Sequence, residues 1–208
     1  PRTQSDRVLY KNAVQNVLAS DENIKIFEGE VVDIHIESGT VKGVELEGGQ
    51  KIEAISIILT TGTFLNGLIR VGEEKIAAGR IGDFASNRLA KKIREIGLNT
   101  GRLKTGTPAR LSSKTINWNL IERQKPDEKP TLFSFLHKKP FQRQISCGIT
   151  YTNKKTHEII GENIERSAVF NGLITSNGPR YCPSIEDKVV RFSDKLEHQV
   201  FLLSLIHI

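Results

Sequence analysis

Apolar and polar residues recur with a period of two within residues 32–46. Residues 32–37 alternate apolar and polar side chains, and residues 41–46 resume an apolar pattern beyond the turn signal Ser38-Gly39. Gly48-Gly49 marks a second turn. This pattern predicts a small antiparallel β-meander, because half-buried strands bury every second side chain.

Two predominantly apolar runs flank the meander, at residues 24–29 and 52–59. Both have the length and β-branched content of buried strands. The second run leads directly into residues 60–63, Thr-Thr-Gly-Thr. A buried strand that ends in glycine is typical of dinucleotide-binding α/β domains, since glycine lets the backbone approach a ligand closely. The fingerprint G-x-G-x-x-G, which would strengthen this interpretation, does not occur in the chain.

Helical spacing of apolar residues occurs at residues 5–20, 86–97 and 156–165. Ser5 and Ser86 stand where N-caps are expected for the first two of these helices. These segments, together with the strands, indicate an α/β fold.

The rest of the chain is less regular. Residues 98–150 are basic and weakly periodic, and their prolines interrupt any long helix. We expect an irregular insertion there, with a short strand within residues 144–151. Residues 167–192 contain several Gly and Pro and are predicted to be a loop region with short elements.

Composition restricts the class of protein. The 208 residues are 38% hydrophobic and 26% charged, which is typical of a globular chain and excludes wholesale disorder. No run approaches the roughly 20 apolar residues of a membrane helix, so we expect no membrane span. Two Cys make no disulfide framework and favour a reducing compartment. The chain contains no Met, so we expect a piece of a longer protein.

The net charge of +6 is unevenly distributed. Residues 1–87 carry 9 basic and 13 acidic side chains (net −4), residues 88–143 carry 14 and 4 (net +10), and residues 144–208 carry 7 of each. The middle segment is either a solvated, loop-rich face or an electrostatic footprint for a polyanion. The solvated face is slightly favoured on charge alone, because few aromatic residues lie between the basic ones. They are Trp118, Phe133, Phe135 and Phe141.

Few residues point to catalysis by local pattern. Cys147 lies in apolar alternation and is predicted to be a small buried hydrophobe. Cys182 lies two residues after Arg180 in a predicted loop. Its neighbours support a reactive thiol and an inert thiol equally well. Glu186-Asp187 is either an acid/base pair or, more commonly, a solvated helix start with charges placed for the helix dipole. The histidines show no metal-ligand spacing, so no metal site is predicted, and neither a serine-hydrolase nor a P-loop motif occurs.

Five collinear blocks resemble the GidA/MnmG family, over about residues 1–200. They are TTGTFLNGLIRVG (60–72), AGRIGD (78–83), GRLKTGTPARL (101–111), ITYTNKKTHEII (149–160) and GPRYCPSIEDKVVRF (178–192). The last block is the most specific, because it fixes Cys, Pro, Tyr and paired acidic residues in one order.

The resemblance implies a partial FAD/NAD(P)-binding domain of the glutathione-reductase type, with a β-meander and an irregular basic insertion. On this basis residues 1–87 belong to the FAD-binding domain, and residues 88–200 form an insertion region with the basic segment and the loop that contains Cys182. Residues 201–208 depart from the family and are expected to be an anomalous tail.

The resemblance also implies a function. Family members are FAD-containing enzymes that act as homodimers with an MnmE-type GTPase, and they add a carboxymethylaminomethyl group to C5 of wobble uridine 34 in tRNA. Their other cofactors are NADH and, as co-substrate, a one-carbon folate. The location would be the cytoplasm of a bacterium or the mitochondrial matrix, and the fragment is not expected to be active alone.

Site residues follow position by position from the family blocks. Val31 and Ser86 match FAD-contacting positions, and a helix start such as Ser86 also suits an anion. Thr61 and Gly62 are further FAD candidates because they stand at the end of the predicted strand. Cys182 matches a catalytic thiol that would add to uridine C6. The segment that matches NAD contacts comprises Gly178, Pro179, Arg180, Tyr181, Cys182, Pro183, Ser184, Ile185, Glu186, Asp187, Lys188, Val189, Val190, Arg191 and Phe192.

The basic segment adds a nucleic-acid prediction, in which Lys91, Lys92 and Arg94 contact tRNA phosphates. Two alternatives keep an enzymatic role, namely a general FAD/NAD(P)H oxidoreductase and a folate-dependent tRNA methyltransferase relative. A third alternative is a non-catalytic RNA-binding module whose only function is its charge.

Overall fold

A computed structural model describes residues 5–178 and 183–203 of the chain. The chain forms two compact units. Unit 1 comprises Pro1–Ile24, Gly106–Asn163 and Tyr181–Ile208, and unit 2 comprises Lys25–Thr105 and Ile164–Arg180. The sequence-based domain boundaries at residues 87 and 200 remain predictions about the whole protein.

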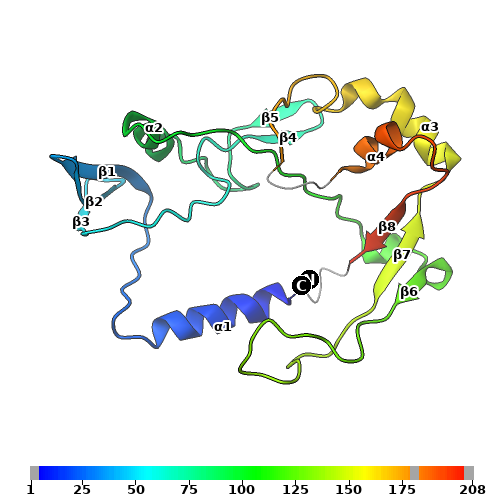
Figure 1. The fold of residues 1–208 in the computed structure, drawn as a ribbon, viewed down its shortest axis with the longest axis horizontal. Coiled ribbons are helices and arrows are strands. Elements are labelled where there is room, and N and C mark those ends of the chain that lie inside the picture. The colour runs from blue at the N-terminus through cyan, green and yellow to red at the C-terminus, as the bar shows by residue number, and fades with distance from the viewer. Residues whose placement is uncertain (1–4, 179–182, 204–208) are drawn as a thin grey trace. The chain divides into compact units, whose positions relative to one another are not determined.

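The predicted β-meander is confirmed in unit 2. Strands β1 (Val31–Glu37), β2 (Thr40–Leu46) and β3 (Lys51–Glu53) form an antiparallel sheet in that order (Figure 1). Ser38 and Gly39 join β1 to β2 with φ angles of 49° and 77°. A two-residue hairpin turn requires this left-handed backbone, which glycine adopts without strain.

Helix α2 (Asn87–Glu95) packs against β1 and confirms the helix predicted at residues 86–97. Ile34 of β1 and Leu89 and Ile93 of α2 form the buried cluster. Leu89 and Ile93 lie four residues apart, so they occupy one face of the helix. Gly97 follows the helix with a φ of 89°, as is common for a residue that ends a helix.

Two glycines bring the loops that precede α2 into direct backbone contact. A Cβ atom on Gly67 would lie 2.7 Å from the carbonyl oxygens of Thr63 and Ala78, and one on Gly79 would lie 2.7 Å from the Cα of Phe64. Thr63 Oγ1 also donates a hydrogen bond to the Gly79 carbonyl, at 2.7 Å. Two of the family blocks therefore meet through glycine because no side chain fits between them.

The pattern did not predict the hairpin of β4 (Ile69–Val71) and β5 (Glu74–Ile76), which lies between these two glycines. Each strand has only three residues, which is too short to show a period.

The strand predicted at residues 24–29 is wrong, and of the strand predicted at residues 52–59 only residues 52–53 form part of a strand. Residues 24–29 lie outside any strand, and β3 ends at Glu53. Ile55 and Ile58 are 98% and 88% exposed. A strand forms only where a neighbour accepts its backbone hydrogen bonds, and no strand among the described residues pairs with residues 24–29 or 55–59.

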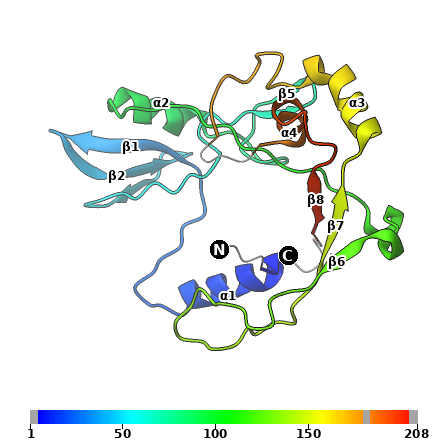
Figure 2. The ribbon, with the colours of Figure 1, turned by 45° about the vertical axis from the view of Figure 1, so that its right-hand side comes forward.

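Unit 1 contains a second antiparallel sheet, with the order β6 (Glu122–Gln124), β7 (Cys147–Tyr151) and β8 (Gln199–Leu202) (Figure 2). Strand β7 confirms the short strand predicted within residues 144–151. Strand β8 was not predicted, and Phe201 and Leu202, at the start of the expected anomalous tail, pair with β7.

The helices of unit 1 are α1 (Arg7–Ala19), α3 (Lys154–Glu162) and α4 (Ile185–Arg191). Helix α1 confirms the first predicted helix, but its N-cap is Asp6 and not Ser5, because the Asp6 carboxylate accepts from the amides of Val8 and Leu9. Helix α3 begins at Lys154, two residues before its predicted start, with Asn153 as its N-cap, and it packs against α4. Short 3-10 helices span Ser113–Thr115 and Trp118–Leu120 in unit 1 and Ile164–Arg166 in unit 2.

Among the described residues, no helix is both long and apolar enough to traverse a lipid bilayer. The same part of the chain holds no group of three or more His, Cys, Asp or Glu side chains arranged to bind a metal ion.

The close approach at Gly79 predicts a specific mutational effect. Gly79→Ala places a methyl group against the Phe64 backbone, and overpacking of this kind costs roughly 1–3 kcal/mol. In the full-length protein we expect a lower midpoint of thermal unfolding. Gly101→Ala is the control, because nothing lies within 4 Å of its Cβ position. Equal midpoints for the two variants would show that the loops can separate at no cost.

Candidate functional site

Three of the four predicted FAD residues lie on one hydrogen-bonded arrangement of loops in unit 2. The Thr61 carbonyl accepts a hydrogen bond from the amide of Phe64 at 3.2 Å, which closes a turn around Gly62. The Ser86 amide donates to the Phe64 carbonyl at 2.9 Å. The turn Thr61–Phe64 is thereby fixed beside the N-terminus of α2.

Ser86 occupies the N-cap position of α2, but its side chain makes no capping hydrogen bond. The first turn of α2 contains no acidic residue. A helix start of this kind favours an anion, because its first amides have no partner within the helix. The Ser86 hydroxyl is thus not committed to the cap.

Val31, the fourth predicted FAD residue, stands at the start of β1, where it pairs with Leu46. Its half-buried side chain packs against the cluster that includes Leu89 of α2. Any ligand contact at Val31 would therefore use its backbone groups.

The predicted NAD and catalytic segment is only partly described. Pro179, Arg180, Tyr181 and Cys182 lie outside the described residues. The structure describes Gly178 and residues 183–192, and most of the latter belong to α4.

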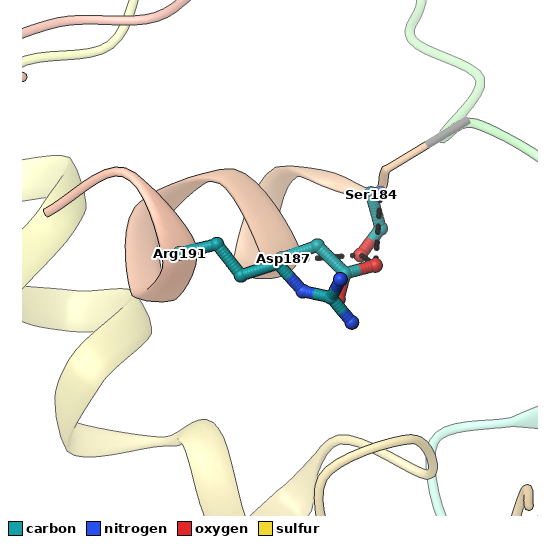
Figure 3. A network of polar contacts seen from close by, with 3 residues as sticks. All are labelled: Ser184, Asp187 and Arg191. Atoms are coloured by element: carbon teal, nitrogen blue, oxygen red, sulfur yellow. Dashed lines mark hydrogen bonds and ion pairs between the residues drawn. The ribbon is translucent and has the colours of Figure 1, made fainter. Parts of the chain in front are cut away.

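A capping box begins α4 (Figure 3). The Asp187 amide donates to Ser184 Oγ at 3.3 Å, and Asp187 Oδ2 accepts from the Ser184 amide at 3.2 Å and from its hydroxyl at 3.1 Å. Arg191 Nε lies 3.5 Å from Asp187 Oδ1. The capping box confirms the helix start for Asp187, but Asp187 is only 5% exposed, so the expectation that this helix start is solvated is wrong there.

The three cations predicted to contact nucleic acid already have partners within unit 2. Lys92 Nζ lies 2.9 Å from Asp33 Oδ1, Lys91 Nζ lies 3.6 Å from Glu95 Oε1, and Arg94 Nε donates to the Ala90 carbonyl at 3.3 Å. The structure therefore gives Lys92 a local role, since its ion pair joins α2 to β1.

The ion pair with Lys92 affects the pKa of the Asp33 carboxyl group. Partial burial raises the pKa of Asp33, but the hydrogen bonds from Lys92 and from the Ile34 amide outweigh it and hold the pKa below its usual value. The carboxylate consequently stays charged, and the link between α2 and β1 persists, down to acidic pH.

Sequence reasoning missed a buried polar cluster in unit 1. His198 is 7% exposed, and its ring stacks on His157 with centroids 5.3 Å apart. Thr152 Oγ1 lies 2.8 Å from His157 Nε2 and accepts a hydrogen bond from the His198 amide at 2.8 Å. No spacing signal could have found this cluster, because the two histidines lie on α3 and just before β8.

The charge state of His198 follows from its surroundings. Burial lowers the pKa of His198, and the positive charges of His157, Lys188 and Lys195 lower it further. Its Nε2 atom is buried and has no hydrogen-bond partner among the described residues. The folded state thus favours the neutral imidazole.

Cys147 lies half-buried in β7 as a free cysteine, next to the buried Gly148 and Ile149. This position agrees with the structural role predicted for it.

The described residues form mixed helices and antiparallel sheets, and comparison with known proteins identifies the family of the chain. A family model described as "Glucose inhibited division protein A" matches residues 1–204. The chain belongs to this GidA family, and the match includes the described residues of β8.

Curated relatives and solved structures agree with this family. The chain is 49% identical, over 97% of its length, to the tRNA uridine 5-carboxymethylaminomethyl modification enzymes MnmG of Thermodesulfovibrio yellowstonii and Granulibacter bethesdensis. It covers 32% and 33% of those proteins. The structure of Aquifex aeolicus GidA in its form I crystal matches 97% of the chain with a TM-score of 0.86 and 42% identity, and the chain covers 35% of it. The chain thus spans about a third of the length of these relatives.

The buried histidine generates a pH prediction. The pKa of His198 is lower in the folded state than its value of about 6.5 in an unfolded chain. Its contribution to stability is therefore complete above about pH 6.5 and is lost as the pH falls below that value. In urea unfolding of the full-length protein, the fall in midpoint from about pH 8 to about pH 5.5 should be smaller for His198→Gln than for the wild type.

His137→Gln serves as the control, because His137 is exposed. It should keep the pH dependence of the wild type. The same fall in midpoint for His198→Gln and the wild type would show that His198 does not titrate in this range.

Proposed function

We propose that this chain is part of an FAD-dependent enzyme that adds a carboxymethylaminomethyl group to C5 of wobble uridine 34 in tRNA. The observation that carries the proposal is the similarity of 97% of the chain to proteins named for this modification. The whole protein would work as a homodimer with an MnmE-type GTPase, in the cytoplasm or the mitochondrial matrix.

The loops of unit 2 supply positions that fit a flavin cofactor in a glutathione-reductase-type domain. The amides at the start of α2 and the uncommitted Ser86 hydroxyl suit a pyrophosphate, and the turn at Thr61 and Gly62 is joined to them. Val31 would contribute its backbone. When bound, FAD would supply the redox chemistry for the one-carbon unit that a folate provides, with NADH as the reductant.

The chemical role proposed for Cys182 follows from the electronics of uracil. Carbon C5 is a poor nucleophile in the intact ring. Addition of a thiolate to C6 forms a C–S bond and moves the C5=C6 electron pair toward C5 and the C4 carbonyl, which makes C5 enolate-like. C5 then bonds to the electrophilic carbon of an iminium formed from the one-carbon unit, and the C=N π pair moves to nitrogen. A general base takes the C5 proton, the C5–H pair re-forms the C5=C6 bond, and the C–S pair leaves with the thiolate.

The capping box of α4 follows this thiol closely in the sequence. Ser184 and Asp187 fix the start of the helix two residues after Cys182 in the sequence. Because Asp187 is buried and bonded to Ser184, we assign its carboxylate to the helix start and not to proton transfer.

The central test replaces the thiol. In the full-length protein, Cys182→Ser should keep the FAD content of the wild type but reduce the modified nucleoside in tRNA digests on the order of 10³-fold or more, because a hydroxyl is a far weaker nucleophile. Mass spectrometry of the digests measures the product.

Cys147→Ser is the matched control and should retain activity, because Cys147 lies within β7. Wild-type levels of modified uridine in the Cys182→Ser protein would remove Cys182 from the mechanism. A wild-type protein that binds FAD but modifies no tRNA would favour the general oxidoreductase.

A further inference from the structure

An arginine stacks on the single tryptophan of the chain, within unit 1. The guanidinium carbon of Arg123 lies 4.5 Å from the centroid of the Trp118 ring. Trp118 Nε1 donates to the Ser113 carbonyl at 3.0 Å, which fixes the orientation of the indole. This arrangement is a cation–π contact with a defined geometry.

The sheet behind the tryptophan supports this contact. Arg123 lies on the edge strand β6 and pairs with Gly148 of β7. A Cβ atom on Gly148 would lie 3.2 Å from Trp118 Cζ3 and 3.0 Å from Ile121 Cγ2. The absence of a side chain at Gly148 therefore lets the indole and Ile121 rest directly on β7.

Arg123 and a second arginine line one depression. Arg143, Gln144, Ile145 and Ser146 lead into β7 and join Arg123 around a volume of about 340 Å³ that is open to solvent. Two arginines that are 20 residues apart in the sequence are thus brought to the edge of one sheet.

Neither arginine is neutralised within the described part of the chain. No carboxylate there lies within ion-pair distance of Arg123 or Arg143. Both belong to the segment 88–143, whose net charge is +10. They differ in this respect from Lys91 and Lys92 of α2, which are paired with Glu95 and Asp33.

This combination fits a phosphate group of RNA. A guanidinium that stacks by its face keeps the N–H donors on its edges, and two of these match a phosphate bidentately. Two arginines without carboxylate partners, one of them on the exposed edge strand β6, are also suited to a single-stranded segment, whose phosphates pair with arginine.

We infer that Arg123 and Arg143, held by Trp118 and β7, form a contact site for the phosphate backbone of tRNA. The inference rests on the proposed function, which makes tRNA the substrate, and it assigns the contact to the sheet of unit 1 in addition to, or in place of, the cations of α2.

The test measures tRNA affinity of the full-length protein by fluorescence anisotropy over a series of salt concentrations. Arg123→Ala/Arg143→Ala should weaken binding about tenfold and reduce the slope of log affinity against log salt by roughly 1.4–1.8, for two lost phosphate contacts. Arg123→Lys keeps the charge but loses the planar stack, so it should give a smaller loss of affinity.

Lys138→Ala/Lys139→Ala is the matched control, because it removes the same charge from exposed positions of the same segment. A loss of affinity and slope equal to that of the arginine variant would attribute the effect to net charge and overturn the inference. The FAD content of every variant should equal that of the wild type, as expected for exposed side chains.

Titration with NADH tests whether the depression binds the phosphates of a dinucleotide and not those of tRNA. If the double arginine variant lost affinity for NADH but not for tRNA, the depression would serve a dinucleotide and the inference would be wrong. Unchanged tRNA affinity in a double variant, beside a wild type that binds and modifies tRNA, would overturn the inference alone. A wild type that neither binds nor modifies tRNA would overturn the proposed function.

Discussion

Ile34 on β1 and Leu89 and Ile93 on α2 are buried against each other, and this contact holds the loops of unit 2 in place. Because α2 is fixed on the meander, its N-terminus has one position relative to the turn at Thr61. The Ser86 amide then bonds to Phe64, and the ion pair between Lys92 and Asp33 adds a second link between helix and strand. The proposed flavin positions therefore depend on a small apolar core that no ligand needs to touch.

Unit 1 depends on β7 in a comparable way. This strand pairs with β6 on one side and β8 on the other. Near its first residue, Gly148 leaves room for the Trp118 ring. Directly after the strand, Thr152 is hydrogen-bonded to His157 and His198. One strand of five residues thus organises both the arginine depression and the buried histidine pair.

The errors of prediction share one physical cause. Residues 52–59 carry the apolar composition of a buried strand, yet Ile55 and Ile58 are exposed. Local composition sets the propensity to be a strand, whereas pairing requires another strand at hydrogen-bonding distance. For β8 the reverse holds, since its sequence gives no strong signal and its pairing with β7 makes it a strand.

The sequence by itself determined the meander, the helices α1, α2 and α3, and the short strand β7, because their periods and turn residues are local properties. It also identified the family, since five blocks of residues follow one another in the order that the family has. The capping box of α4 was foreseen only as a charged helix start. Only the tertiary structure decided which cations are already paired and that Arg123 stacks on Trp118. It also decided that two histidines 41 residues apart share a buried cluster, because contacts between distant segments leave no spacing in the sequence.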